Sequence, residues 1–531
     1  MTKRILLILC SVLIVPSLFA DDWPVVKFPA RESFREVSDK WNDTPEVPGR
    51  HLKLTVTPAE LPYPLLKYRL NTYVTEMESG NAAPLYSEAF SLLCQREARA
   101  LDGVYQSEEY ARAQWPKLFG EERPKGAEAW DATGKLKFKA FPIPAHWGQA
   151  LWTEIDATVE EQLYTHNLRQ VFHLIEKASK KRDCDWGYII ERKGIATMLE
   201  HIQQMRELAR FLQGKANWEI SNGKFDDAVK TIRLGLRLSE HVKTSESPFL
   251  VTELVGIAIQ GIMTSELHLL SAQPDAPNLY PAFTQVIEPA GVFQKSLQAE
   301  QYWFFSRENV QEVFERMDTA TDDEYKALLN EMITLVFSTA LTGSEQKEIN
   351  LPNLTTMACI VCYPYGKARL LKQGLTDDEI DQMSTYRVVV PYVLEEIKAA
   401  YDLLIVASAF PVGSQHTAIV FDDRDATNIS DSPAKIYLAL LLPAVQAAKN
   451  AFLRQEQSLD LLKIVEAIRY YAAVHDGQLP ESLEAMEELY VPTVNPMDAK
   501  PYVYRTEGNT AIIDFTVLAP SGVSRMEVTV E

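Results

Sequence analysis

The sequence predicts a mainly α-helical protein, with an irregular body of helical hairpins and a small C-terminal α+β unit made of a long helix and a short antiparallel sheet. Apolar residues recur every three or four positions through most of residues 151–430, which is the period of a helix face. A further helical pattern runs from about Pro433 to Val474 and stops at Asp476 and Gly477. Beyond it, apolar and polar residues alternate, which predicts strands.

Length and charge limit the class of protein and its partners. The chain has 531 residues, of which 46% are hydrophobic, so a large core can form. The formal net charge is −20, which repels nucleic-acid phosphates and anionic lipid headgroups. We therefore expect no nucleic-acid partner, and the partner that remains open is an unknown protein.

Residues 1–20 have the pattern of a signal peptide. Lys3 and Arg4 precede an apolar run from Ile5 to Val15, and Ala20 offers a small residue for cleavage. We expect a periplasmic or secreted protein with no membrane span after cleavage, because no later stretch offers roughly 18 uncharged apolar residues. Retention of the segment as an uncleaved anchor stays an alternative.

Two segments precede the central domain. Residues 21–60 are rich in proline and charge without a sustained period, which predicts an extended lead-in. Residues 61–150 are predicted to be helical at first, because Leu85, Ala89 and Leu92 share one helix face, and irregular later, where Pro, Gly and Trp are frequent.

The central domain, residues 151–430, contains one clear helical hairpin. Apolar stripes that include Ala216 and Ala228 flank Gly223, where a helix end needs a residue that tolerates positive φ. The spacing resembles a tetratricopeptide repeat, but no copy occurs about 34 residues away. We therefore expect a single such hairpin in an irregular helical fold.

Other turn and packing signals follow in the same domain. Gly256 and Gly261 fall inside an apolar helix, where glycine is unfavourable unless a neighbour packs closely. Thr376 and Glu379 have the spacing of a capping box. Pro391 marks the start of a helix or a kink within it.

Several stretches of the chain together resemble a family of secreted bacterial helical proteins with no assigned activity. The similarity covers about residues 65–405 and is carried, in order, by GNAAPLYSEAFSLL, NGKFDDAVKTIRLGL, LVGIAI with APNLY, and YPYGKARLLKQGLTDDEIDQM. The resemblance implies a helical fold, and it brings no catalytic residues to this chain.

The tail, residues 431–531, is similar to the C-terminal half of the major pseudopilins of type II secretion. The stretch YYAAVHDGQLPESLEAM carries this resemblance, because a helix leads through Gly477 and Pro480 towards a predicted hairpin at Gly508. No apolar pilin-type helix precedes the unit, so the resemblance implies the fold of the tail and not polymerisation in a membrane.

The candidate disulfide or redox residues are Cys94, Cys184, Cys359 and Cys362. An even number of cysteines beyond the signal peptide makes disulfides plausible in an oxidising compartment, and the three pairings stay open. Cys359 and Cys362 form a CxxC pair, which can be a redox site when the thiol pKa is lowered. The strand before and helix after such a motif are missing, so we expect structural cysteines, bridged or free.

No catalytic, cofactor-binding or metal-binding residues are predicted. The sequence lacks a GxSxG elbow, a phosphate-binding loop and a dinucleotide fingerprint, and no second ligand pair supports a zinc site. Acidic and histidine residues that folding could bring together are Glu160, Glu161, His166, His173, Glu176, Asp377, Asp378, Glu379, Asp422 and Asp423.

We therefore expect a non-enzymatic scaffold or protein-interaction protein of the cell envelope, without a cofactor. One alternative is an envelope hydrolase whose carboxylate and histidine site is assembled from distant segments. The other is an accessory of a secretion or pilus-like system, which the tail alone suggests.

Overall fold

The computed structural model describes residues 51–93, 166–188, 201–243, 249–285, 290–305, 310, 316, 319–340, 351–408, 435–516 and 523–531. The predicted signal peptide, most of the lead-in and the irregular part of residues 61–150 lie outside the described residues.

The described chain is mainly helical and carries a small four-stranded sheet, which confirms the coarse fold class. The α-helices include α7 His166–Ser179, α9 His201–Ser221, α10 Phe225–Lys243, α11 Leu250–Ser271, α12 Tyr280–Phe283, α13 Ala290–Phe305, α15 Asp322–Ala340, α16 Leu351–Lys372, α17 Asp377–Asp381, α18 Thr385–Ser408 and α20 Lys435–Val474. Residues 83–93 are helical as well, where the spacing of Leu85, Ala89 and Leu92 predicted a helix. The strands are β1 His51–Val56, β2 Glu78–Asn81, β3 Lys181–Asp183, β4 Val503–Glu507, β5 Thr510–Thr516 and β6 Val523–Val530.

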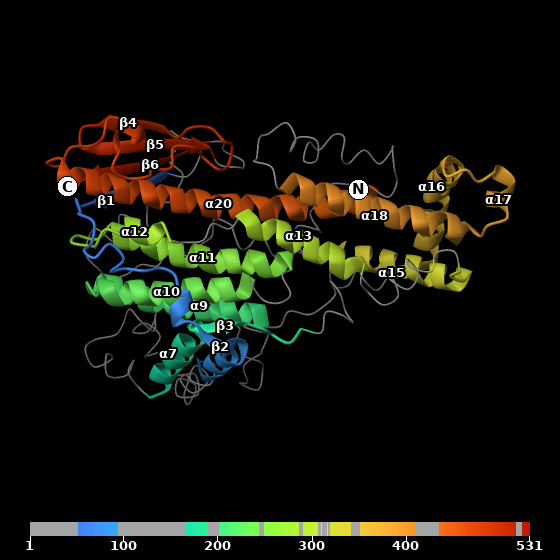
Figure 1. Ribbon diagram of the computed structural model, residues 1–531, viewed down its shortest axis with the longest axis horizontal. Coiled ribbons are helices and arrows are strands. Elements are labelled where there is room, and N and C mark those ends of the chain that lie inside the picture. The colour runs from blue at the N-terminus through green and yellow to red at the C-terminus, as the bar shows by residue number, and fades with distance from the viewer. Residues whose placement is uncertain are drawn as a thin grey trace, which may run out of the picture.

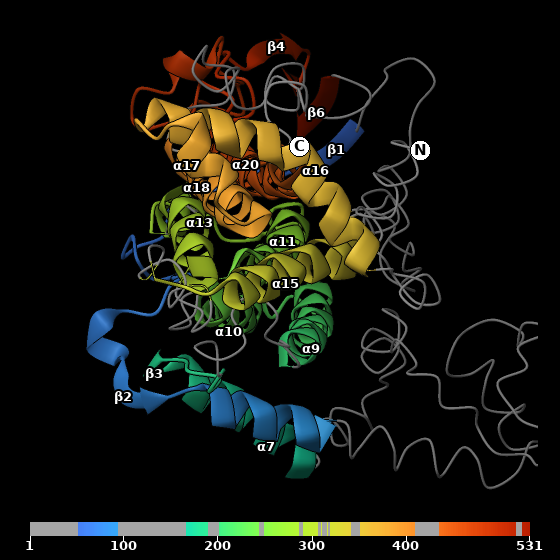
Figure 2. The ribbon, with the colours of Figure 1, turned by 90° about the vertical axis from the view of Figure 1, so that its right-hand side faces the viewer.

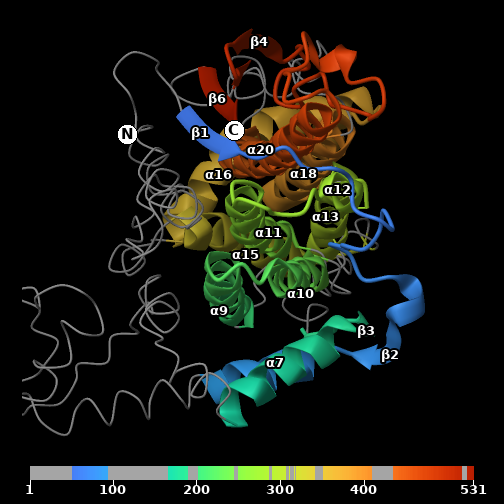
Figure 3. The same ribbon diagram turned by 90° about the vertical axis from the view of Figure 1, so that its left-hand side faces the viewer.

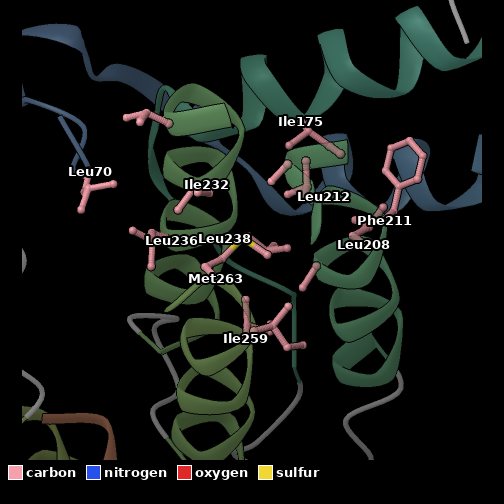
Figure 4. Packing of buried hydrophobic residues seen from close by; sticks show 14 of the residues in the cluster. Leu70, Ile175, Leu208, Phe211, Leu212, Ile232, Leu236, Leu238, Ile259 and Met263 are labelled. Atoms are coloured by element: carbon pink, nitrogen blue, oxygen red, sulfur yellow. The ribbon is translucent and has the colours of Figure 1, made fainter. Parts of the chain in front are cut away.

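Helices α9 and α10 form the predicted hairpin. Gly223 takes a φ of +69° in the turn between them, and Ala216 and Ala228 are fully buried where the two helices face each other. Helix α11 packs against both members of the hairpin. Figure 4 shows the interior of this layer, in which Leu212, Ile232 and Met263 represent the three helices. The apolar periodicity of the sequence therefore placed this core correctly.

Helix α11 lies in the middle of the molecule. A methyl group on Gly256 would stand 2.3 Å from Cγ of Lys243 and 3.0 Å from the backbone oxygen of Ser239, which confirms the predicted close packing there. At Gly261 the nearest atom would be 3.5 Å away, so close packing is wrong for that residue. Helix α11 is long and apolar enough to cross a membrane, but 78% of the apolar stretch is buried inside the protein.

The four-stranded sheet has the order β1-β6-β5-β4. Strands β4, β5 and β6 are antiparallel, and Gly508 takes a φ of +61° in the predicted hairpin turn. Strand β1 pairs in parallel with β6, with His51 opposite Arg525 (Figure 3). The sheet is therefore mixed, not purely antiparallel, and the end of the expected lead-in, residues 51–56, is one of its strands. The sequence could not show this pairing because its partner lies more than 400 residues away.

Helix α20 lies between this sheet and the helical body (Figure 1). Ile464, Val465 and Ile468 belong to the core that also contains Leu54 of β1 and Ile513 of β5. On its other side α20 packs against α11, α12, α13 and α18. The C-terminal unit has the expected helix and hairpin, and its helix is covered by the body on one side and by the sheet on the other.

Helices α15, α16, α17 and α18 form one end of the molecule (Figures 1 and 2). Thr376 and Glu379 form the predicted capping box, in which the Thr376 hydroxyl accepts from the backbone N–H of Glu379. Pro391 lies inside α18, in its second turn, so its interpretation as a helix start is wrong. The core of this end includes Cys359, Cys362 and Val389.

Candidate functional site

Glu466 and Arg469 of α20 form an ion pair with no exposed surface on either side chain. The carboxylate also accepts from the Ser271 hydroxyl at 2.5 Å and from the backbone N–H of Leu279 at 2.9 Å. The guanidinium donates to the backbone oxygens of Thr57 and Ala276. Both charges are therefore satisfied by groups of the protein, and the pair joins the N-terminal segment, the end of α11 and α20.

Glu266 of α11 is a second buried carboxylate. Gln213 donates to one of its oxygens at 2.9 Å and Asn217 donates to the other at 3.2 Å, both from α9. Burial raises the pKa of Glu266 to about 7, and the hydrogen bonds from these amides lower it by less. The carboxyl group therefore changes its charge near neutral pH while it stays enclosed between two helices.

Lys243 of α10 and Glu253 of α11 lie close together in the interior. Burial lowers the pKa of Lys243 and raises that of Glu253, and the charge of each residue opposes the shift of the other. The ammonium group donates to the side-chain oxygen of Gln260 at 2.6 Å. A buried acid and base with opposed shifts are typical of active sites, but they also occur where two helices are held in register.

Tyr86, in the helical residues 83–93, and Lys181 of β3 are both bonded to His241 of α10. Nε2 of His241 donates to the backbone oxygen of Lys181 at 2.9 Å, so Nδ1 accepts from the Tyr86 hydroxyl, also at 2.9 Å. Arg237 donates to the same Lys181 oxygen at 2.8 Å. Burial lowers the pKa of His241 to about 3, so the imidazole is neutral and serves as a fixed hydrogen-bonding group.

These four groups have the bonding pattern of structural polar contacts. Three of the groups bond to side chains or backbone atoms at least 49 positions away in the sequence. Lys243 and Glu253 instead link the consecutive helices α10 and α11, and both carboxylate oxygens of Glu253 are buried without a hydrogen-bond partner among the described residues. Within the described ranges, no group of three or more histidine, cysteine or acidic residues could hold a metal ion. The geometry therefore fits structural groups that fix helix register better than a catalytic centre.

The acidic and histidine residues singled out in the sequence do not come together in the described chain. His173 and Glu176 are exposed on α7, and Glu176 pairs with Lys180. Asp377 lies in the first turn of α17, where it pairs with Lys367 at 2.9 Å. The remaining acidic pairs, at 160–161 and 422–423, lie outside the described residues.

The described cysteines carry free thiols. Cys359 and Cys362 are buried in the middle of α16 and face the core shared with α15 and α18. Burial raises the pKa of Cys359, raises that of Cys362 to about 11 and raises that of Cys184 to about 12. A redox pair needs a lowered thiol pKa, so burial of these thiols favours the expected structural role, and these three cysteines are free. Cys94 lies outside the described residues.

The opposite side of α16 is an exposed apolar surface. Met357 is 60% exposed, Ile360 is 68% exposed and Val361 is 46% exposed. Leu371, near the C-terminal end of the helix, is also exposed. No charged residue occurs in the 16 positions from Leu351 to Gly366. We call the exposed residues Met357, Ile360, Val361, Pro364, Ala368 and Leu371 the α16 face.

The inner side of α16 is held firmly, which keeps the α16 face outward. Gly366 lies so close to α18 that an added methyl group would stand 2.4 Å from the Val388 oxygen. Arg369 forms an ion pair with Glu395 of α18, and the Thr355 hydroxyl donates to Asn330 of α15 at 2.5 Å. Figure 2 shows α16 running across the outside of this end of the molecule.

The CxxC pair lies on the buried side of α16 and gives no sign of the exposed side. A better signal was the charge-free run around it, in a chain where 24% of residues are charged. A helix that is apolar all round is expected to be covered on all sides, and large exposed apolar patches mark interaction sites.

Comparisons with protein-family models, with curated proteins and with solved structures find no match to this chain. The resemblances noted for residues 65–405 and for the tail therefore stay predictions.

Proposed function

We propose that this chain is a secreted or periplasmic, non-enzymatic scaffold or protein-interaction protein of the cell envelope. The observation that carries the proposal is the α16 face, where Ile360 is 68% exposed on a helix without charge over its first 16 residues. An apolar surface of this kind gains free energy when a partner removes it from water. The signal-like N-terminus supports the compartment, and the tetratricopeptide-like hairpin belongs to the same scaffold role.

The buried charged groups support a scaffold in a second way. Glu466, Glu266 and His241 are bonded to backbone and side-chain groups of other elements, so they hold the helices in one arrangement. A fixed arrangement lowers the entropy that binding would otherwise cost. The hydrolase alternative gains less support, because the buried carboxylates of Glu466 and Glu266 are bonded to groups of the protein.

The test is a comparison of two baits in extracts of the cell envelope. Ile360→Glu places a charge on the α16 face, and Val503→Glu places the same charge on β4, where Val503 is 59% exposed. We expect a protein that the wild-type bait and the Val503→Glu bait recover, and that the Ile360→Glu bait recovers at least about ten-fold less, since a buried unpaired carboxylate opposes binding. Equal recovery by all three baits would contradict the proposal.

An accessory role in a secretion or pilus-like system is the second candidate. Strand β4 is at the end of the sheet order and pairs only with β5 among the described strands. An open strand edge can bind an extended segment of another chain. This candidate predicts the opposite outcome of the same experiment, with recovery lost for Val503→Glu and kept for Ile360→Glu.

A further inference from the structure

The α16 face has a spacing that is symmetric about Pro364. Ile360 and Ala368 lie four positions before and after Pro364, and Met357 and Leu371 lie seven positions before and after it. All five residues are exposed. Offsets of four and seven positions return to the same side of an α-helix, so these residues form one stripe whose two halves match in position.

We propose that the α16 face binds the α16 face of a second copy of this chain, with the two helices antiparallel and a two-fold axis at Pro364. The inference rests on the proposed function, because it names the partner of the same surface. In a two-fold contact each residue pairs with its counterpart in both directions. Met357 then meets Leu371, and Ile360 meets Ala368, so a large side chain faces a smaller one in each inner pair.

The distribution of charge favours this pairing. Lys367 and Arg369 of α16 are held by Asp377 and Glu395 of the same chain, and they lie in the half of the helix after Pro364. Antiparallel pairing places that half opposite the charge-free half of the second copy. Two copies with a net charge of −20 each repel one another overall, and no acidic side chain belongs to the α16 face.

The size of the surface sets the expected affinity. Met357 and Leu371, at the two ends of the stripe, are 14 positions apart, which is about 21 Å along a helix. One helix pair of this length buries less than the ~1,200 Å² of a stable interface, so the contact belongs to the weak class. We expect a dimer with a dissociation constant on the order of 10 µM.

Disulfide trapping tests the register. Pro364→Cys lies on the axis, so two copies are expected to cross-link through this residue under mild oxidation. Met357→Cys alone is not expected to cross-link, because the two thiols are about 21 Å apart along the antiparallel pair, far beyond the reach of a disulfide, about 7 Å between Cα atoms. It is expected to cross-link when mixed with Leu371→Cys. Wild-type chain oxidised in parallel controls for its own cysteines.

Sedimentation velocity tests the contact itself over about 1–200 µM, the range that brackets the expected affinity. Wild type and Val503→Glu are expected to dimerise alike, and Ile360→Glu is expected to weaken the dimer at least about ten-fold, since it buries a carboxylate twice. A wild-type chain that stays monomeric, or Met357→Cys that cross-links alone, would overturn the inference. The inference would also be overturned if the monomer floated with phosphatidylcholine vesicles and Ile360→Glu abolished this flotation, because a membrane would then be the partner of the α16 face.

The two proposals fail differently. A monomeric wild type whose envelope partner still depends on Ile360 would overturn the self-association and leave the scaffold role. If the wild-type chain dimerises but the wild-type and Ile360→Glu baits recover the same envelope proteins, the scaffold role is overturned and the antiparallel contact remains.

Discussion

Nη1 of Arg469 lies 2.9 and 3.0 Å from the two carboxylate oxygens of Glu466, one turn earlier on α20, and neither side chain has exposed surface. Because Arg469 also donates to Thr57 in the N-terminal segment, this pair links residues more than 400 positions apart. Removing one member of a buried pair leaves the other charge without compensation.

We predict that Glu466→Ala lowers the free energy of unfolding by about 3–5 kcal/mol, the range for one lost partner of a buried ion pair. Denaturant unfolding measures this change. Glu487→Ala is the control, because Glu487 is exposed and a surface substitution is expected to stay within about 0.5 kcal/mol. A loss below about 1 kcal/mol for Glu466→Ala, the size of an exposed pair, would contradict the structural role.

Glu266 makes stability depend on pH. Its pKa rises from 4.5 to about 7 on burial, so between these values the folded protein keeps a proton that the unfolded chain releases. The contribution of Glu266 is therefore fully present below pH 4.5 and falls as pH rises towards about 7. We predict that the free energy of unfolding of Glu266→Gln, relative to that of wild type, rises by up to about 3 kcal/mol as the pH increases between those limits.

The measurement is the difference in unfolding free energy between variant and wild type across that range. Other buried groups titrate in the opposite direction, such as His268, whose pKa burial lowers from 6.5 to about 4, and the subtraction removes their effect. Glu487→Gln, on an exposed carboxylate, is the matched control. A difference for Glu266→Gln that does not change with pH would show that Glu266 is not held protonated.

Tyr86→Phe removes only the hydroxyl group, which donates to Nδ1 of His241 at 2.9 Å. We predict a loss of about 1–3 kcal/mol, because a buried imidazole nitrogen is left without its partner. Thermal or denaturant unfolding gives the value. Tyr490→Phe, at a residue that is 86% exposed, should leave stability unchanged, and equal effects of the two variants would contradict the buried contact.

Two glycines of α11 should respond to alanine with opposite signs. Gly256→Ala would bring a methyl group within 2.3 Å of Lys243, so we predict a loss of about 1–3 kcal/mol from overpacking. At Gly261 the nearest atom would be 3.5 Å away, and alanine is better than glycine inside a helix by up to about 1 kcal/mol. The same unfolding experiment serves both variants, and a shared sign would show that the α10–α11 contact differs from the one described.

Local sequence signals predicted much of the helical fold. The 3.6-residue period and Gly223 placed the α9–α10 hairpin, and Gly508 placed the β4–β5 turn. Strand β1 escaped prediction because a strand pairing is recognised only with its partner, and that partner is β6 at the other end of the chain. Proximity within the sequence carries no information about such a contact.

The candidate site was harder to predict than the fold. Glu466 and Arg469 have the three-residue spacing of an ordinary surface pair, and only the packing of α20 between the sheet and the body makes them buried. The CxxC motif suggested thiol chemistry, but α16 turns both cysteines inward. The exposed apolar side became visible only once the helix had a defined inner face.

The most direct test of the account is the rate of Met357 oxidation to the sulfoxide, because this rate follows exposure. Met357 is 60% exposed and Met263 is fully buried, which supplies an internal reference. The account predicts that Met357 reacts at least roughly five-fold more slowly in the intact cell envelope than in dilute purified protein, with an added methionine peptide to correct for reagent access. Equal rates in the two settings would contradict it, because the α16 face would then be uncovered where the protein works.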